Sequence, residues 1–177
     1  MSAEAPAHPV RPRHAASLIL LRKTAGGPQV LMGRRPAKSR FAPDVFVFPG
    51  GRLDAADFAR PVLAPLADDC VRRTGADARL AAALASAAIR ETEEETGLTL
   101  ANDHAPLTLA ARAITPTNSP VRFHARFFAV DADLAGGQRA VFGACHMTVN
   151  FSVGDIVNDA AGRAHQKSTR HKNQQYI

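Results

Sequence analysis

The residues with the clearest chemical potential form one acidic stretch, Arg90-Glu91-Thr92-Glu93-Glu94-Glu95-Thr96-Gly97. On an α-helix, positions i, i+3 and i+4 share a face, so Glu91, Glu94 and Glu95 are expected to project together. Two such charges about 4 Å apart repel by roughly 4 kcal/mol at an effective dielectric constant near 20. A hard divalent cation offsets this repulsion, and Mg²⁺ binds carboxylates, water and phosphate. The spacing therefore predicts a metal site, with Arg90 able to pair with Glu94.

The alternative is an ordinary solvent-exposed helix end. Like-charge pairs on exposed helices cost only a few tenths of a kcal/mol each, so a hydrated run of glutamates needs no ion. Acids in the last helical turn nevertheless oppose the helix dipole, a local cost that a functional site explains. A second motif, Phe48-Pro49-Gly50-Gly51, strengthens the functional interpretation. Two glycines after a strand let the backbone turn sharply and bring its carbonyl and amide groups close to a ligand.

Hydrophobic patterns predict the elements that position these residues. Apolar residues at helical spacing, with Asp77 before them and Gly97 after them, predict a helix over 77–96. Two apolar runs separated by turn-forming residues predict a hairpin. The expected strands are 17–22 and 29–34 in that hairpin, then 45–48, 98–100, 107–114, 121–131 and 147–153. A C-terminal helix is weakly indicated over 160–172. Strands before and after a long helix predict an α/β or α+β sandwich.

Composition limits the remaining functions. The chain has 177 residues, 46% of them hydrophobic and 21% charged, which is typical of one globular domain. Its longest apolar run, residues 15–21, is far shorter than the roughly 20 residues that span a bilayer. No secretory signal is evident, and two cysteines fit a reducing compartment, so we expect a cytoplasmic protein without a membrane segment. The net charge of +6 favours anionic partners, but one Tyr and no Trp argue against nucleic acid.

Together the two motifs resemble the signature of the Nudix hydrolases. That signature joins a glycine, an acid six positions later and an Arg-Glu-x-x-Glu-Glu-x-Gly helix. Gly51 and Asp57 have the first spacing, and residues 90–97 match the second half in order. The resemblance implies a Nudix-type α/β/α sandwich with a mixed sheet, in which the acidic helix is catalytic.

The resemblance also implies a reaction and the residues that perform it. It implies Mg²⁺ or Mn²⁺ bound by Glu91, Glu94, Glu95 and the carbonyl of Gly51, with Arg90 orienting these ligands. The implied reaction is hydrolysis of a phosphoanhydride, in which the metal polarises the phosphate and activates a water molecule. Arg90, Glu91 and Glu94 are then the catalytic residues, with Glu91 as the base. A base outside the motif is left open, and the weak candidates for it are Asp131 and Asp133.

The sequence departs from the signature in three places. Asp57 stands where glutamate is usual, and Thr92 occupies a slot that is usually aliphatic. Residues 58–89, which number 32, separate the acid from the arginine where seven are usual, so the insertion is 25 residues long. Loop closure costs only about 0.6 kcal/mol per doubling of length, so an insertion that loops out before the helix is tolerable.

The split signature resembles the coenzyme A diphosphatase branch of the family. The sequence of residues 48–57 is similar to that of this branch. Arg35 and Arg40 fall where a coenzyme A-associated motif places two arginines. The implied substrate is coenzyme A or an acyl-CoA, bound by Arg35, Arg40 and Gly50, unless these arginines are only hydrated surface residues. A homodimer is left open. The alternatives are a hydrolase of another nucleoside diphosphate derivative and a weakly active module that binds metal and nucleotide.

The chain is expected to have three parts. Residues 1–14 form a disordered lead, and residues 15–133 form the Nudix domain, in which 58–89 contain the insertion and the start of the catalytic helix. Residues 134–177 are atypical and are expected to be poorly ordered or altered, because the strand and helix that close the family fold are not clear there. Arg122 and Arg126 share a strand face, so they are expected either to line a site or to face water.

Overall fold

The computed structural model describes residues 10–34, 45–136 and 146–152. Its first two strands, β1 (Arg13–Thr24) and β2 (Gly27–Arg34), form the antiparallel hairpin predicted from the two apolar runs. Pairing ends at Thr24 and Gly27, where the Thr24 hydroxyl donates to the Gly27 carbonyl at 2.7 Å. The turn therefore falls within the segment of turn-forming residues.

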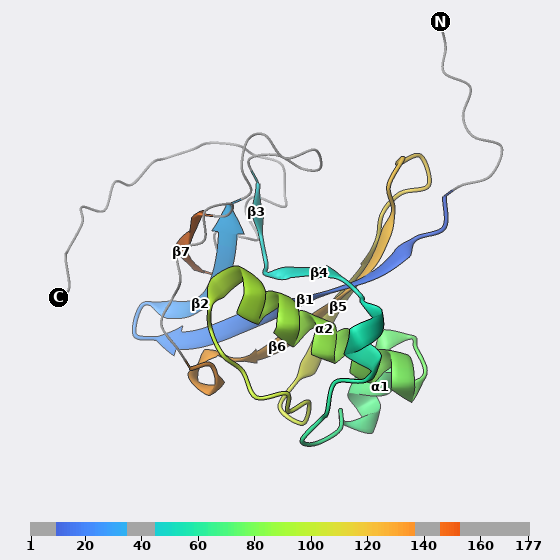
Figure 1. The fold of residues 1–177 in the computed structure, drawn as a ribbon. Helices are drawn as coiled ribbons and strands as arrows, with labels where there is room; N and C mark the ends of the chain where they lie inside the picture. Colours follow the sequence, from blue (N-terminus) through green and yellow to red (C-terminus); the bar gives the residue numbers. More distant parts are fainter. Residues whose placement is uncertain (1–9, 35–44, 137–145, 153–177) are drawn as a thin grey trace, which may run out of the picture.

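The described strands form one mixed sheet (Figure 1). Its main order is β3 (Phe46–Val47), β2, β1, β6 (Phe123–Asp131) and β5 (Thr108–Ile114), while β4 (Gly50–Arg52) pairs with β1 and β7 (His146–Ser152) pairs with β2. β1 and β6 run parallel, and the other pairs are antiparallel. The glycine turn, Gly50 and Gly51 of β4, is therefore paired directly with the central strand β1.

The helix α2 (Ala78–Thr96) contains the acidic stretch, as predicted. The Asp77 side chain caps its start by accepting the Leu80 amide hydrogen at 2.7 Å. Gly97 ends it in the left-handed conformation, with φ 69°, and donates its amide to the Glu93 carbonyl. Figure 1 shows α2 lying across one face of the sheet, with α1 beside it. The caps fix both ends of the helix, so its last turn lies in a defined position against β4.

The hydrophobic core lies between α2 and the sheet. One side of α2 is lined with buried alanines, whose small side chains let the helix approach the strands closely. Leu84 and Ile89 of the helix belong to the same buried cluster as Leu18 of β1 and Phe128 of β6. Full burial of one such side chain contributes about 1.5–3 kcal/mol. This packing holds the acidic end of α2 beside the glycine turn.

Residues 58–89 contain one helix more than the predicted loop and start of the catalytic helix. A short 3-10 helix, η1 (Ala55–Phe58), leads into the segment, which contains a further helix, α1 (Asp68–Thr74), and the start of α2. Helix α1 ends at Gly75, which has φ 64°, and it buries the free thiol of Cys70 in the core. Two turns are too short to give a periodic signal, so this helix was missed.

The chain after α2 also differs from the prediction in part. Residues 98–100 form no strand, and instead Thr99 makes an isolated bridge with Gly136 through two N–H···O bonds of 2.8 Å. The strand expected at 147–153 is confirmed as β7, one residue earlier. The helix weakly indicated over 160–172 lies outside the described residues. Within the described ranges, no helix is long and apolar enough to cross a membrane.

Candidate active site

The side chain of Arg90 connects the two sequence motifs. Its Nε donates to Asp57 Oδ1 at 2.8 Å, and its Nη2 donates to Asp57 Oδ2 at 3.1 Å, which makes a bidentate ion pair. Nη2 also donates to the carbonyl of Arg52 at 3.2 Å. The Asp57 side chain is only 1% exposed, so the pair is shielded from water. The pKa of Arg90 is raised, chiefly by its hydrogen bond with Asp57, and the guanidinium stays charged.

A capping box places Asp57 under Arg90. The Asp54 carboxylate accepts the Ala56 amide hydrogen at 3.1 Å, and the Asp54 amide donates to Asp57 Oδ2 at 2.8 Å. These bonds fix Asp57 on η1 before the chain departs into residues 58–89. The acid six positions after Gly51 therefore anchors the arginine of the helix, although 32 residues separate them in the sequence.

Arg90 also holds two of the three glutamates that were predicted to bind metal. Its Nη1 donates to Glu91 Oε1 at 2.9 Å and to Glu94 Oε2 at 3.2 Å. The pair with Glu94 was predicted from the spacing of four residues, whereas the contact with the adjacent Glu91 was not. The side chain of Glu91 is 18% exposed and that of Glu94 is 58% exposed. Glu91 is thus the more protected of the two carboxylates.

The two glycines bring the backbone directly against the acidic helix. A Cβ atom on Gly51 would overlap the carboxylate of Glu91, and a Cβ atom on Gly50 would overlap Ser17 of β1. The Gly50 amide donates to Glu95 Oε2 at 3.1 Å. At Gly50 the close approach is to the backbone of β1, so glycine is required there, whereas at Gly51 a Cβ atom would displace the carboxylate end of Glu91.

The three carboxylates do not meet at one point, which corrects the prediction from the helical face. Glu94 is drawn toward Arg90 and Glu95 toward the glycine turn, and no three Asp, Glu, His or Cys side chains of the described residues are placed to hold one ion. The groups that do lie together are the Glu91 carboxylate and the Gly51 backbone. Carboxylate and peptide oxygens are the donors that Mg²⁺ and Mn²⁺ prefer, so the chemistry of this pair fits a divalent ion.

Two residues between the site glutamates have structural roles that the sequence did not predict. Glu93 points away from the site, where its Oε2 accepts from Arg60 at 2.6 Å and its Oε1 accepts from the Leu100 amide at 3.2 Å. Thr92 is fully buried, and its hydroxyl donates to the Ala88 carbonyl at 2.8 Å. A polar residue is tolerated in the slot that is usually aliphatic because its hydroxyl is satisfied within the helix.

The arginines expected near the substrate have different outcomes. Arg35 and Arg40 lie outside the described residues, so their role stays a prediction. Arg122 and Arg126 do not face water, which excludes one of the two expectations for them. Both are buried, and both donate to backbone carbonyl groups. An alternating strand pattern indicates which residues share a face, but not that the face carrying two arginines is the inner one.

The chain is similar to known proteins in both sequence and fold. The NUDIX domain family model matches residues 11–168. The crystal structure of a NUDIX hydrolase from Alicyclobacillus acidocaldarius is 25% identical in sequence, with a TM-score of 0.71, over 86% of this chain and 85% of that chain. A MutT/nudix family protein from Enterococcus faecalis is 16% identical, with a TM-score of 0.50, over 80% of this chain and 45% of that chain. Among curated proteins, none matches.

The family match includes both motifs and all the described strands. The TM-score of 0.71 shows that this chain shares its fold with the Alicyclobacillus acidocaldarius NUDIX hydrolase. The chain therefore belongs to the Nudix family, and it is a hydrolase with the Nudix fold.

Proposed function

We propose that this hydrolase cleaves the diphosphate bond of coenzyme A or an acyl-CoA with the help of a divalent metal ion. Nudix hydrolases act on nucleoside diphosphate derivatives and generally use divalent metals such as Mg²⁺ or Mn²⁺. The observation that carries the proposal is the contact between the Glu91 carboxylate and the Gly51 backbone, held in place by Arg90. The similarity of residues 48–57 to the coenzyme A diphosphatase branch favours coenzyme A or an acyl-CoA as the substrate.

Glu91 and Gly51 are the inner pair of the proposed metal site. Glu91 supplies a carboxylate oxygen and Gly51 its carbonyl. Glu94 and Glu95 accept from Arg90 and from the Gly50 amide, and each would have to leave that donor to become a further ligand. When bound, a divalent ion polarises the phosphoanhydride and lowers the pKa of a coordinated water molecule. The chain's contribution is to hold hard oxygen donors on two rigid elements, the capped helix α2 and the short strand β4.

Arg90 is a positioning residue in this scheme. Its bidentate pair with the buried Asp57 leaves Nη1 to hold Glu91 and Glu94. The orientation of Glu91 therefore depends on an ion pair that water cannot easily reach. Fixing donors before the substrate arrives avoids reorganisation during the reaction.

Glu91 is also the general base that we assign. No glutamate follows Glu95 in the sequence, so a base outside the motif would have to be another residue type. One such acid, Asp131, has a structural role, because its carboxylate caps η2 (Ala132–Leu134) by accepting the Asp133 amide hydrogen at 3.0 Å. A base that is positioned by hydrogen bonds in the site typically contributes 10²–10⁴-fold to the rate.

The test is product analysis with coenzyme A and Mg²⁺ or Mn²⁺. We expect phosphopantetheine and adenosine bisphosphate, a loss of about 10²-fold or more in kcat for Glu91→Gln, and a smaller loss for Glu94→Gln. Glu93→Gln is the matched control, because it removes the same charge from a side chain in the same helical turn that points away from the site. Equal turnover by Glu91→Gln and wild type would contradict the assignment of the site. Faster cleavage of another nucleoside diphosphate derivative, such as a nucleoside diphosphate sugar, would instead contradict the substrate.

A further inference from the structure

The C-terminal end of α1 is attached to the sheet by two arginines. Arg126 of β6 is 1% exposed, and its Nε donates to the Thr74 carbonyl at 3.2 Å. The guanidinium of Arg112 of β5 lies against Gly75, because a Cβ atom on that glycine would overlap Arg112 Nη1. Cations at this end of a helix complement its dipole. A helix as short as α1 is not stable alone, so it depends on such attachments.

Arg126 is in turn held by a histidine that has to be neutral. Its Nη1 donates to the His124 carbonyl at 3.0 Å and contacts His14 Nδ1 at 3.0 Å. Because arginine can only donate, His14 Nδ1 must accept, and the ring carries its proton on Nε2. Protonation of Nδ1 removes the acceptor and places a second positive charge beside a buried guanidinium. The bond therefore exists only while His14 is uncharged.

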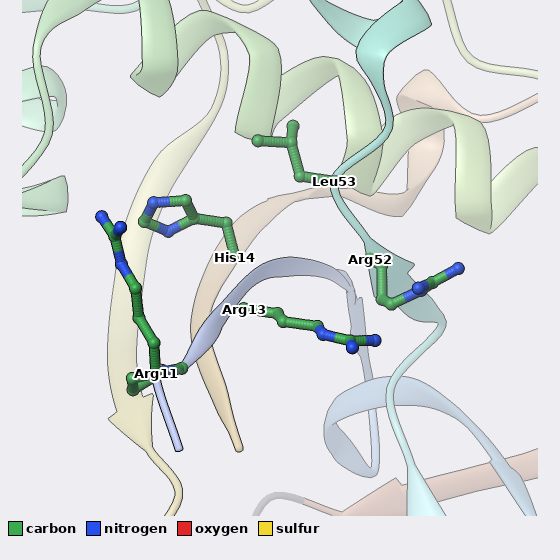
Figure 2. Close-up of a pocket in the computed structure, with 6 residues that line it drawn as sticks. Arg11, Arg13, His14, Arg52 and Leu53 are labelled. Carbon is green, nitrogen blue, oxygen red and sulfur yellow. The ribbon is translucent and has the colours of Figure 1, made fainter. Parts of the chain in front are cut away.

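His14 lies on the face of the sheet that the helices cover. It lies two residues before Ala16 of the buried core, and alternate residues of a strand share a face. Figure 2 shows His14 and Arg11 on one side of β1, with Arg13 and Arg52 extending from the other. The ring also lines a pocket of about 310 Å³. A proton can therefore reach the ring from solvent, although the ring lies beside the core.

Among the described residues, the charged groups that face His14 are basic. Arg126 lies on β6, Arg11 precedes β1, and the ring centroid of His124 is 6.0 Å from that of His14. Burial lowers the pKa of His14, and the charges of Arg126 and Arg11 lower it further. Burial also lowers the pKa of His124, followed by the charges of Arg126, Arg112 and His14. Each proton that binds here therefore meets existing positive charge.

The acidic side chains of the neighbouring elements do not offset this charge. Asp57 of η1 is occupied by its buried ion pair, and Asp54 caps the same element. Asp68 and Asp69 lie in the first turn of α1, at the opposite end of that helix from the two arginines. No carboxylate among the described residues raises the pKa of His14. A protonated ring would therefore lack a counterion.

We propose that α1 is docked on the sheet through a proton-sensitive contact, in which protonation of His14 breaks its bond to Arg126 and loosens the hold of Arg126 on Thr74. The bond to Thr74 is the longest of the three that fix this guanidinium, so it is the weakest link to the helix. A histidine with a lowered pKa in the folded state favours opening once pH falls below its usual value of 6.5, by up to about tenfold per pH unit. The contact lies within the insertion and does not depend on the substrate.

Labelling of the buried Cys70 thiol on α1 measures the docking. Dithiodipyridine reacts with accessible thiols in mild acid, and mass spectrometry of the peptide that contains Cys70 gives the rate. Division by the rate of the urea-unfolded chain at the same pH removes the pH dependence of the thiol itself. We expect this ratio to be constant above about pH 7 and to rise about fivefold or more as pH falls to about 5.5.

His14→Asn is the test variant, because its side-chain oxygen takes the place of Nδ1 and cannot be protonated. We expect it to keep at most about a twofold rise. His104→Gln is the matched control and should keep the full rise, because it removes another buried histidine with a lowered pKa, which contacts Ser86 of α2 instead. Thermal unfolding at about pH 8 verifies folding, and His14→Gln, which also keeps an acceptor, replaces a variant that does not fold.

Two kinds of result overturn the proposal. One is a labelling ratio that stays constant with pH in the wild type, or that rises as much in His14→Asn as in the wild type. The other is an equal loss of the rise in His14→Asn and His104→Gln, because Cys70 would then be reached through unfolding of the whole domain.

Discussion

Replacement of Asp57 by asparagine tests whether the buried ion pair organises the site. The two side chains have nearly the same shape, so the change removes the charge and one acceptor without leaving a cavity. Breaking a buried pair costs about 3–5 kcal/mol when the partner is left unpaired. Arg90 keeps three acceptors here, namely Glu91, Glu94 and the Arg52 carbonyl, and its side chain is 22% exposed. We therefore expect a smaller loss of unfolding free energy, about 2 kcal/mol.

Urea unfolding and steady-state kinetics measure the two consequences of this substitution. With a slope of about 2 kcal/mol per molar urea, a loss of 2 kcal/mol lowers the midpoint by about 1 M. The kcat should fall about tenfold or more, because a loosened Arg90 no longer fixes Glu91 beside Gly51. Asp69→Asn is the control, since it breaks an ion pair with Arg72 of similar length, 2.8 Å, on the exposed surface. Such surface pairs contribute less than about 1 kcal/mol.

Two results would refute this reasoning. If Asp57→Asn and Asp69→Asn shift the urea midpoint equally, the bidentate pair with Arg90 does not stabilise the fold. If Asp57→Asn loses stability but keeps its kcat, Arg90 does not position Glu91, and its role is confined to joining η1 to α2.

Three further predictions test neighbouring features. Gly51→Ala should lower kcat about tenfold or more with little loss of stability, because the new Cβ displaces only the flexible end of Glu91. Gly26→Ala is the control, because its Cβ would meet its nearest atom at 3.8 Å. Glu93→Gln should lower the unfolding free energy by about 0.5–1 kcal/mol and keep the activity within twofold. Burial lowers the pKa of His104 below 6.5, so stability should fall as pH drops below that value, by at most about 1.4 kcal/mol per unit. His104→Gln should flatten this pH dependence in urea titrations, and an unchanged slope would contradict it.

The sequence predicted the parts of the fold that rest on local signals. Helix α2 was predictable because Asp77 caps its start, Gly97 ends it and its apolar residues recur at helical spacing. The hairpin of β1 and β2 was predictable because turn-forming residues separate two apolar runs. The resemblance to the Nudix signature also implied that the glycine turn and the acidic helix lie together, and Gly51 does lie against Glu91.

The parts that were missed depend on contacts between distant residues. The helical face predicted that Glu94 and Glu95 would join Glu91 at one point. Instead, Arg90 donates to Glu94 and the Gly50 amide donates to Glu95. Helical spacing indicated the pair of Arg90 with Glu94, but it cannot reveal the bond from the Gly50 amide to Glu95, because that donor comes from another element. The burial of Arg126 was missed for a similar reason: two of its three acceptors, the Thr74 carbonyl and His14, lie far from it in the sequence.

The long insertion is compatible with the site because the chain that enters it is tied to α2 at two points, through Asp57 and Arg60. At the start, the capping box of Asp54 and Asp57 holds the acid that Arg90 requires. At the base of the insertion, Arg60 pairs with Glu93 at 2.6 Å and ties the departing chain to the last turns of α2. Since loop-closure entropy grows only slowly with length, two local anchors suffice to keep the spacing that the signature encodes. Variation in length within the insertion should therefore be tolerated as long as these two contacts are kept.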